Sequence, residues 1–413
     1  MPTASFSEKL EVFLLCALLF SLPTMETPKT LALLLYVMTW VGRRVSWSGL
    51  SRFRPDGIEL ALLVMLTVGL VSTAMNWPFP NGSKGILDTL RYVVLFWCIY
   101  RAGYGEKQQR LLGCAIVLGV LVGLVYGVME VLEGKRAHLE FHSAGVVTQS
   151  SIYLGIATVV GVGFVVAALS GQEAGGRRLA FWSVATIVMI IGLFAMGSRG
   201  AMIAFVVIVF MLLVLIREKR LWYAAAIVLP AAAALILILP SSFQSSRIYS
   251  RMEQTVTQET MPSADLERMH VWRLTLAHLG RGEHLWFGVG PKNFQSIDVA
   301  AVVLPEQLKP GGFHLTHAHN MFLNKLAEEG VFGLGALLVF FGLVAVTLMR
   351  AVRSGGWRRW TWIAAVGALL VPAIAGSFNT PFYQEHALLA MAVLAIYLGS
   401  ERQAKQASRN SSV

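Results

Sequence analysis

Three histidines lie close together near the end of the one long polar stretch of this chain: His314, His317 and His319. A histidine near its ordinary pKa accepts a proton from a hydroxyl group at neutral pH, so the cluster is a candidate for base catalysis. Histidines also bind zinc, but the preceding polar segment offers no cysteines and the spacing fits no familiar zinc site. From spacing alone, the simplest interpretation is a wet interfacial loop lined by histidines.

Groups that could bind an anion accompany the histidines. Asn320 is expected to begin a helix over 320–329, whose exposed backbone amides would attract an anion. Arg199 lies in the Gly-Ser-Arg-Gly turn at 197–200, between two apolar runs, where flexible backbone and a planar guanidinium suit phosphate binding. The alternative for Arg199 is an ordinary tight turn whose arginine extends to lipid headgroups.

The polar stretch is predicted to contain one amphipathic helix that starts near Asp265. Arg268 and Trp272 are four residues apart and share a face, whereas Arg273 lies roughly 140° around the helix from Arg268. The alternative for Arg268 is a solvated charge paired with a neighbouring carboxylate. An apolar stripe is expected to rest this helix on the bundle or the bilayer surface: Leu266, Met269, Trp272, Leu276 and Leu279.

Composition indicates the elements that must position these residues. Hydrophobic residues make up 56% of the 413 residues and charged residues 14%, which is typical of a chain dissolved in lipid. A span needs roughly 20 apolar residues that satisfy their own backbone hydrogen bonds. We therefore predict an all-α, polytopic transmembrane helical bundle, a single domain over 1–413. About twelve spans are expected, near 10–23, 29–42, 58–75, 87–101, 110–132, 150–169, 179–196, 200–216, 221–240, 329–349, 360–376 and 384–399. The alternative for the first two runs, which are short, is one re-entrant hairpin.

Basic residues predict the orientation of the bundle. Most of the 34 lysines and arginines fall on the side of the N-terminus, and positive residues of short loops stay cytoplasmic, so both termini are expected inside. The loop 241–316 is then extracytoplasmic. The net charge of +11 reflects this bias and contact with anionic headgroups. No basic stripe indicates nucleic-acid binding, and no phosphate-binding loop is present, so energy for chemistry must arrive with the substrate.

Other polar residues on the outer side are weaker candidates. Arg91 lies one turn into the fourth span, where a local ion pair with Asp88 is the simpler expectation, and Arg136 lies in an outer loop. Residues 285–294 are expected to form a glycine-hinged turn that returns toward the membrane. Tyr383 and Gln384 of the last outer loop are placed to touch a substrate. Three cysteines in or beside apolar spans are expected to be small packing residues: Cys16, Cys98 and Cys114.

The glycines that follow the histidines complete a recognisable pattern. His319-Asn320, nine further residues, and then Gly330 to Gly333 resemble a motif of the O-antigen ligase and polymerase superfamily. The Gly-Ser-Arg-Gly turn at 197–200 is similar to a second motif of that family. Arg268 and Trp272, followed by Gly288 and Gly290, resemble a third. The motifs occur in the family's order, and the expected spans and outer loop match its topology.

This resemblance implies an activity for the chain. Such ligases of the Gram-negative inner membrane transfer a glycan from undecaprenyl diphosphate to a sugar hydroxyl of the lipid A–core acceptor, on the periplasmic face, without nucleotide or metal. The implied roles are base catalysis by His319, with inversion at the anomeric carbon, and diphosphate binding by Arg199 and Arg268. Asn320 would orient the base or bind a sugar hydroxyl. Supporting candidates outside the pattern are His314, His317, Arg91 and Arg136.

Two kinds of alternative remain open. An O-antigen polymerase or a protein O-oligosaccharyltransferase shares the motifs and the lipid-linked donor but uses another acceptor. A transporter of lipid-linked glycan is a more distant alternative, because transport sites are usually ionisable groups or broken helices near the membrane midplane. The ionisable residues of this chain gather at the outer ends of spans instead, which favours chemistry at one face.

Overall fold

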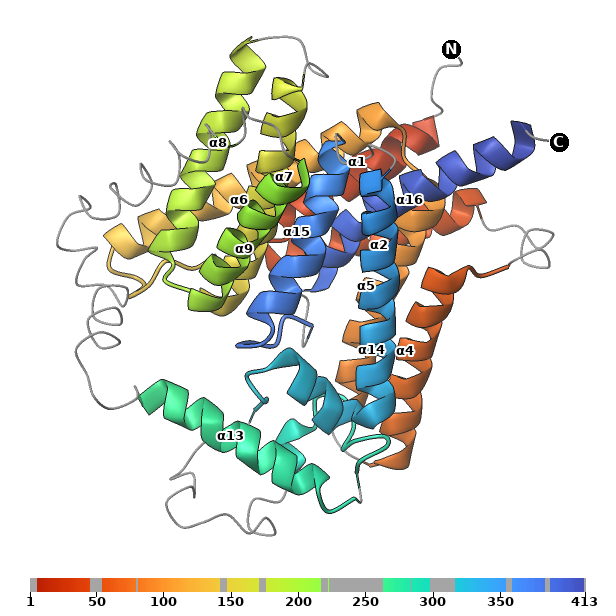
Figure 1. The fold of residues 1–413 in the computed structure, drawn as a ribbon, viewed down its shortest axis with the longest axis vertical. Helices are drawn as coiled ribbons and strands as arrows, with labels where there is room; N and C mark the ends of the chain where they lie inside the picture. The colour runs from red at the N-terminus through yellow and green to blue at the C-terminus, as the bar shows by residue number, and fades with distance from the viewer. Residues whose placement is uncertain are drawn as a thin grey trace.

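The protein folds into helices throughout the part of the chain that the computed structural model describes, namely residues 6–44, 54–78, 81–141, 147–170, 176–216, 222, 263–282, 284–297, 316–353, 359–382 and 387–411. No strand occurs among these residues, in agreement with the all-α prediction. Most helices form a bundle, and α13 lies across one end of it (Figure 1). The elements are α1 Phe6–Ser21, α2 Glu26–Arg44, α4 Gly57–Met75, α5 Gly82–Ala102, α6 Glu106–Leu132, α7 Val147–Leu169, α8 Gly176–Ala195, α9 Arg199–Ile216, α13 Ser263–Leu279, the 3₁₀ turn Phe294–Ser296, α14 Met321–Arg353, α15 Trp360–Ala375 and α16 Ala387–Ser411.

Several of these helices can cross a membrane. Among the described residues, six helices are long and apolar enough to do so: α4, α6, α7, α8, α9 and α14. The helix bounds follow the predicted spans, because each apolar run ends at turn-forming or charged residues. The predicted span 221–240 lies almost entirely outside the described residues. The count of twelve spans and the extracytoplasmic loop 241–316 therefore stay predictions.

The interior of the bundle is built around α7, α15 and α16, which are almost entirely buried along their apolar parts. At Gly367 of α15 a Cβ atom would lie 2.6 Å from the Cβ of Val159 on α7, so these helices approach closely. Phe164 of α7 stacks between the rings of Trp182 and Trp360, with centroid separations of 4.3 and 4.5 Å. The cysteines lie within helices α1, α5 and α6, and Cys98 is buried, as expected of packing residues.

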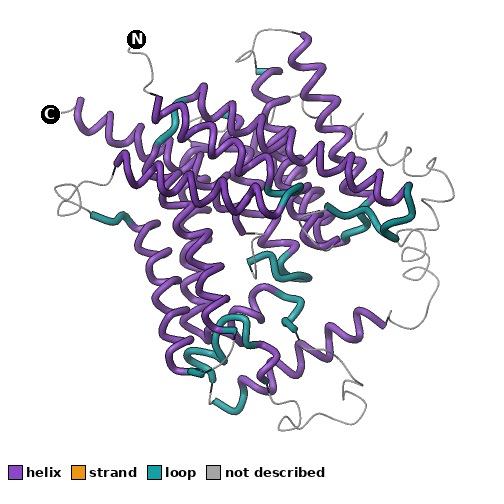
Figure 2. Tube along the Cα trace, turned by 180° about the vertical axis from the view of Figure 1, so that it is seen from behind, coloured by secondary structure: helices purple, strands orange, loops and turns teal. Residues whose placement is uncertain are grey.

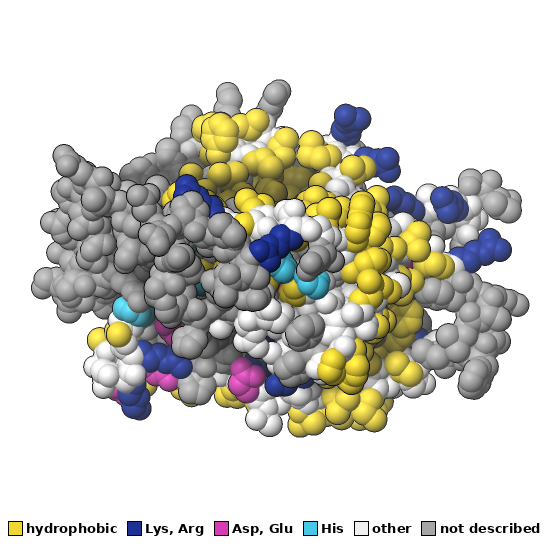
Figure 3. Space-filling view, turned by 90° about the horizontal axis from the view of Figure 1, so that it is seen from below, with side chains coloured by type: hydrophobic (Ala, Val, Ile, Leu, Met, Phe, Trp, Pro, Cys, Tyr) yellow, Lys and Arg dark blue, Asp and Glu magenta, His cyan; other side chains and the backbone are white. Residues whose placement is uncertain are grey.

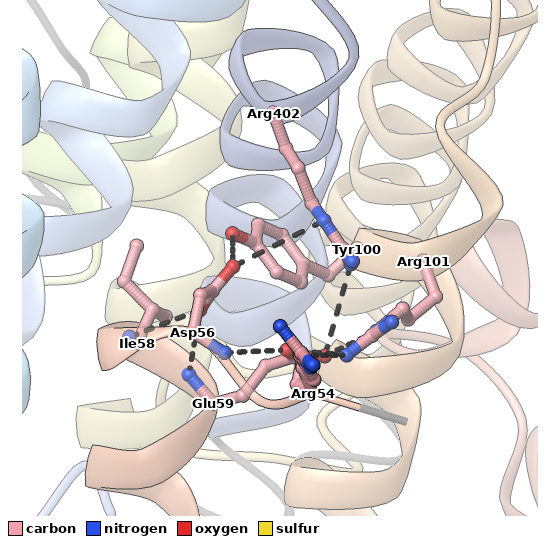
Figure 4. Close-up of polar contacts among 7 residues, drawn as sticks. All are labelled: Arg54, Asp56, Ile58, Glu59, Tyr100, Arg101 and Arg402. Carbon is pink, nitrogen blue, oxygen red and sulfur yellow. Dashed lines mark hydrogen bonds and ion pairs between the residues drawn. The ribbon is translucent and has the colours of Figure 1, made fainter. Parts of the chain in front are cut away.

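A charged cluster joins three helices at the end of the bundle where α4 begins (Figure 4). Glu59 is 2% exposed and accepts a hydrogen bond from Arg101 of α5 at 2.6 Å, while Arg402 of α16 approaches it to 3.8 Å. Asp56 caps α4 by accepting the backbone amide of Glu59 at 3.1 Å, and it also accepts a hydrogen bond from the Tyr100 hydroxyl. Because a buried charge is costly unless it is paired, the cluster fixes α4, α5 and α16 relative to one another.

The opposite end of the bundle holds α13. Helices α4 and α14 extend beside one another to this end, and the loop residues that follow α13 lie against them (Figures 1 and 2). The turn after α15 also reaches this end, because the backbone amide of Met321 donates a hydrogen bond to the carbonyl of Gly376 at 2.6 Å. The candidate histidines and arginines of the sequence must be positioned by these elements.

Candidate functional site

The first half of α14 is separated from the second by a break at Gly330, where φ is 69° and ψ is −167°. The amides of Val331 and Phe332 donate hydrogen bonds to the carbonyls of Leu285 and Trp286, at 2.8 and 3.4 Å. In a continuous helix these amides would donate to carbonyls four residues earlier. A Cβ atom at Gly330 would lie 2.2 Å from the carbonyl carbon of Trp286, so only glycine fits at this position.

The carbonyl groups on the other side of the break bind the same loop. Ala327 and Glu328 accept backbone hydrogen bonds from Val289 and Gly290, at 3.0 and 2.8 Å. Gly288 and Gly290 have φ values of 65° and 95°, which non-glycine residues rarely adopt. We call the four hydrogen bonds between 285–290 and 327–332 the glycine joint. The glycine joint gives a physical reason for two of the sequence motifs, because Gly288 and Gly290 lie on one side of it and Gly330 lies on the other.

Gly333, the second glycine of its motif, makes room for a buried ion pair. A Cβ atom at Gly333 would lie 2.2 Å from the Cβ of Glu329, whose carboxylate pairs with Lys325. Glu329 is 2% exposed and Lys325 is 9% exposed. The first half of α14 is therefore polar inside as well as outside, which is consistent with a position at the end of a span rather than within it.

Two small polar residues of α4 hold the loop of the glycine joint. Ser72 donates its hydroxyl to the carbonyls of Phe287 and Glu328, the latter at 2.9 Å. Asn76 donates its side-chain amide to the carbonyl of Gly288 at 2.9 Å. Lys292, two residues beyond the joint, pairs with Asp88 of α5. The prediction that 285–294 is a glycine-hinged turn returning to the bundle is thus confirmed. Sequence reasoning missed Ser72 and Asn76, although polar residues at the end of an apolar span are a readable signal.

The loop that carries the histidines is fixed at Ala318, which is fully buried. The amide of Ala318 donates to Oδ1 of Asn324 at 3.0 Å, and its carbonyl accepts a hydrogen bond from Nε1 of Trp272 at 2.9 Å. His317 and His319 flank this residue, and their ring centroids are 4.1 Å apart. The histidines are therefore held by α13 on one side and by the first turns of α14 on the other.

His319 is held in a strained, partly buried position. Its φ of 50° lies in the left-handed region, which costs a non-glycine residue roughly 1 kcal/mol or more. Burial, the neighbouring His317 and the positive charge of Arg268 lower the pKa of His319 to about 4. Burial also lowers the pKa of His317. The imidazole of His319 is consequently uncharged at neutral pH and able to accept a proton.

Arg268 lies on the face of α13 that is turned to the histidines, as does Trp272. Arg273 is exposed on another face, so the predicted difference between the two arginines is confirmed. The predicted apolar stripe is wrong in part: Leu276 is 54% exposed. The buried face of α13 is formed instead by Val271, Leu274, Thr275 and Leu279.

Asn320 begins the short helix, as predicted, but it does not leave the amides open to an anion. Its Oδ1 accepts hydrogen bonds from the amides of Phe322 and Leu323, at 2.9 and 3.0 Å. The amide of Met321 donates to Gly376, as described above. Asn320 also donates its Nδ2 group to the carbonyl of Ser377 at 3.1 Å. The expected anion site at this helix start is therefore wrong, and Asn320 fastens the histidine loop to the turn after α15.

Arg199 lies at the same end of the molecule. It is exposed as the first residue of α9, after Gly197 with φ of 67°. A Cβ atom at the next residue, Gly200, would lie 3.3 Å from the Cα of Ala375. Ala375 precedes Gly376, whose carbonyl accepts a hydrogen bond from the amide of Met321 at the start of α14. The turn after α15 thus connects the Gly-Ser-Arg-Gly turn with the histidine loop.

The remaining candidates are placed differently. Arg91 pairs with Asp88 at 3.3 Å, as predicted, and Arg136 pairs with Glu130 at 2.8 Å and Glu140 at 3.2 Å. These pairs give both arginines a structural role. No group of three or more histidine, cysteine or acidic side chains among the described residues is arranged to hold a metal ion. Outside the described residues lie His314, Tyr383 and Gln384.

The end of the molecule that carries α13 combines a base with positive charge. Figure 3 looks at this face and shows histidine side chains beside a basic side chain, with hydrophobic side chains on one flank. An uncharged imidazole next to a guanidinium can take a proton from a hydroxyl group while the positive charge stabilises a developing anion. The long apolar helices indicate a multi-pass helical membrane protein, and this polar cluster of histidine and arginine side chains lies at one end of its helices.

A comparison with protein families found a match over part of the chain. Residues 184–338 match the family model described as O-antigen ligase, which confirms the resemblance seen in the motifs. The matched segment contains Arg199, Arg268, His319 and the whole glycine joint. No curated protein sequence matches the chain. Over this segment the chain is similar to O-antigen ligases.

Proposed function

We propose that this protein is a glycosyltransferase that moves a glycan from undecaprenyl diphosphate to a sugar hydroxyl of the lipid A–core acceptor. The observation that carries the proposal is that His319 lies near Arg268 of α13. The loop that carries His319 is held by hydrogen bonds to the amide and the carbonyl of Ala318. A base of unusually low pKa in a strained conformation beside a guanidinium is typical of a functional site. Its position inside the matched segment supports the same conclusion.

The proposed reaction is a single displacement. The acceptor oxygen forms a bond to the anomeric carbon while the bond between that carbon and the diphosphate oxygen breaks. His319 takes the hydroxyl proton, and the bonding electron pair leaves with the diphosphate, whose added negative charge is stabilised by Arg268. Inversion at the anomeric carbon follows from one displacement. No nucleotide or metal takes part in the proposed scheme, because the diphosphate is already a good leaving group.

Arg199 is proposed as the second contact of the diphosphate. It is exposed at the start of α9, at the end of the bundle that also holds the histidine loop. A guanidinium binds two phosphate oxygens in one plane, and a lysine cannot reproduce that geometry. Trp272 and Asn320 are positioning residues in this scheme. Trp272 binds the carbonyl next to the base, and Asn320 fastens the histidine loop to Ser377 in the turn after α15.

Orientation in the membrane is part of the proposal. We infer that the end with α13 faces the periplasm and that the protein lies in the bacterial inner membrane, because basic residues concentrate on the opposite side. Lipid-linked donor and acceptor would then meet at the outer ends of the spans. The described parts of the long polar stretch, residues 263–282 and 284–297, lie at this end (Figure 1).

Reconstitution with defined substrates tests the proposal. Purified protein in liposomes, given undecaprenyl-diphosphate-linked glycan and rough lipopolysaccharide, is expected to attach glycan to the core. His319→Ala should lower the rate by ~10²–10⁴. His278→Ala, ten residues along α13 from Arg268, should retain activity. Transfer only to a second lipid-linked glycan would identify a polymerase instead, and full activity of His319→Ala would refute the base.

A further inference from the structure

A cavity at the end of the bundle opposite to the histidines has the composition of a lipid site. It lies between the first turns of α6 and α8 and the last turns of α7, and it measures about 360 Å³. The ends of these helices lie away from α13 (Figure 1). The lining residues lie outside the segment 184–338 that matches the ligase family. They are Arg110, Cys114, Phe164, Arg177, Arg178, Phe181 and Trp182.

The apolar wall of the cavity is rigid. Trp182 is 7% exposed and Phe164 is 1% exposed, and the ring of Phe164 stacks on those of Trp182 and Trp360. A Cβ atom at Gly113 of α6 would lie 2.6 Å from both Phe164 and Trp360, so α6 is pressed directly onto this stack. Phe181 is half exposed at the side of the cavity. Such a wall suits the upper part of an acyl chain, which needs no polar partners.

The remaining lining is basic. Arg177 and Arg178 are both exposed in the first turn of α8, and Arg110 faces them from α6. Arg110 pairs with Glu106 at 2.7 Å. The described lining itself contains three arginines and no acidic residue. Arg110 and Arg177 lie about one turn nearer the helix ends than Cys114 and Phe181. Positive charge at the ends of spans with apolar surface one turn deeper matches a phospholipid, whose phosphate lies above its acyl chains.

We propose that this cavity binds one anionic glycerophospholipid, with its phosphate among the three arginines and an acyl chain against the aromatic stack. Charge complementarity selects an anionic over a zwitterionic lipid. The apolar wall distinguishes a lipid from free phosphate, which would leave that wall in contact with water. The bound lipid fills the space between α6 and α8, and it stabilises the packing of both helices on α7.

Lipid binding to purified full-length protein tests the proposal. In detergent, phosphatidylglycerol should remain bound in native mass spectra and raise the melting temperature, whereas phosphatidylcholine should do neither. Arg177→Glu with Arg178→Glu should weaken phosphatidylglycerol binding at least about tenfold, since each basic residue near an anionic surface contributes about 1 kcal/mol. Cys114→Trp, which fills the apolar part, should prevent binding with all three arginines intact.

A matched control separates this site from general surface charge. Arg350 and Arg353 are exposed at the same end of the bundle, in the last turn of α14, and neither lines the cavity. Arg350→Glu with Arg353→Glu is expected to bind phosphatidylglycerol as the wild type does. An equal loss in this control would overturn the proposal in favour of nonspecific attraction. Stabilisation by inorganic phosphate equal to that by phosphatidylglycerol would also overturn it, because the acyl chain would then be unnecessary.

Discussion

Gly288 and Gly330 each lie against the backbone of the segment that holds the other, so neither position has room for a side chain. A Cβ atom at Gly288 would lie 2.3 Å from the carbonyl carbon of Glu328, and one at Gly330 would lie 2.2 Å from that of Trp286. Both glycines also have positive φ values. The histidine loop precedes one segment of this joint and α13 precedes the other, so the joint determines how the proposed base and its arginine meet.

Gly330→Ala is expected to disrupt the joint and abolish transfer, because the added Cβ atom overlaps backbone that cannot move without breaking hydrogen bonds. Gly335→Ala is the matched control, since no atom lies within 4 Å of its Cβ position in the same helix. That control should be neutral or more stable by about 0.5–1 kcal/mol. Transfer assays and melting temperatures of the two variants provide the comparison. Equal activity of both variants would contradict the role given to the joint.

The pH dependence of transfer should report the lowered pKa of His319. The imidazole must be uncharged to accept a proton. As the pH is lowered through 6.5, kcat/KM should therefore stay constant, and it should fall only as the pH approaches about 4. The same lowered pKa affects the free energy of unfolding. Its contribution is fully present above pH 6.5 and is lost as the pH falls from 6.5 toward 4, because the unfolded chain then binds a proton that the folded protein does not. Steady-state rates between pH 4 and 8 measure the first effect. A fall in kcat/KM centred at pH 6.5 would contradict this prediction.

Arg268→Gln is expected to act in two separable ways. Removing the positive charge raises the pKa of His319, so the acid limb of kcat/KM should move to higher pH. It should also reduce the maximal rate by ~10²–10³, as when one group that stabilises a developing anion is removed. Arg273→Gln, exposed on another face of α13, serves as the control and should alter neither quantity. An unchanged pH profile in Arg268→Gln would separate this arginine from the base.

Glu59→Ala should destabilise the protein by about 3–5 kcal/mol, because Arg101 would be left largely buried without its carboxylate. The control is Glu401→Ala in α16, whose partner Arg359 is 53% exposed, and its effect should stay below about 1 kcal/mol. Denaturant-induced unfolding in mixed micelles compares the two. Glu59 lies far along α4 from the histidine loop, so the fraction of Glu59→Ala that remains folded should keep its activity. Similar stabilities for both variants would mean that the cluster in Figure 4 does not fix the helices.

The helices were predictable because each apolar run ends at residues that stop a span. The buried face of α13 could not be predicted from the sequence. Leu274 and Leu276 are both apolar, and only the surrounding structure decides which of them is covered. Helical spacing predicted that Arg268 and Trp272 share a face of α13, whereas the position of Arg268 near the histidines was implied only by the family resemblance. The left-handed conformation of His319 was not predicted. The hydrogen bond from Asn320 to Ser377 was not predicted either, because it joins residues that are distant in sequence.

The break in α14 also has a consequence for length. A straight helix of its 33 residues would measure about 50 Å, whereas the hydrocarbon layer is about 30 Å thick. Ending one axis at Gly330 and starting another lets the apolar part match the layer while Lys325 and Glu329 stay in the polar region. The same element thereby carries an apolar span and the first turns that hold the histidine loop, so a change in the depth of the span would also change the height of His319 above the lipid.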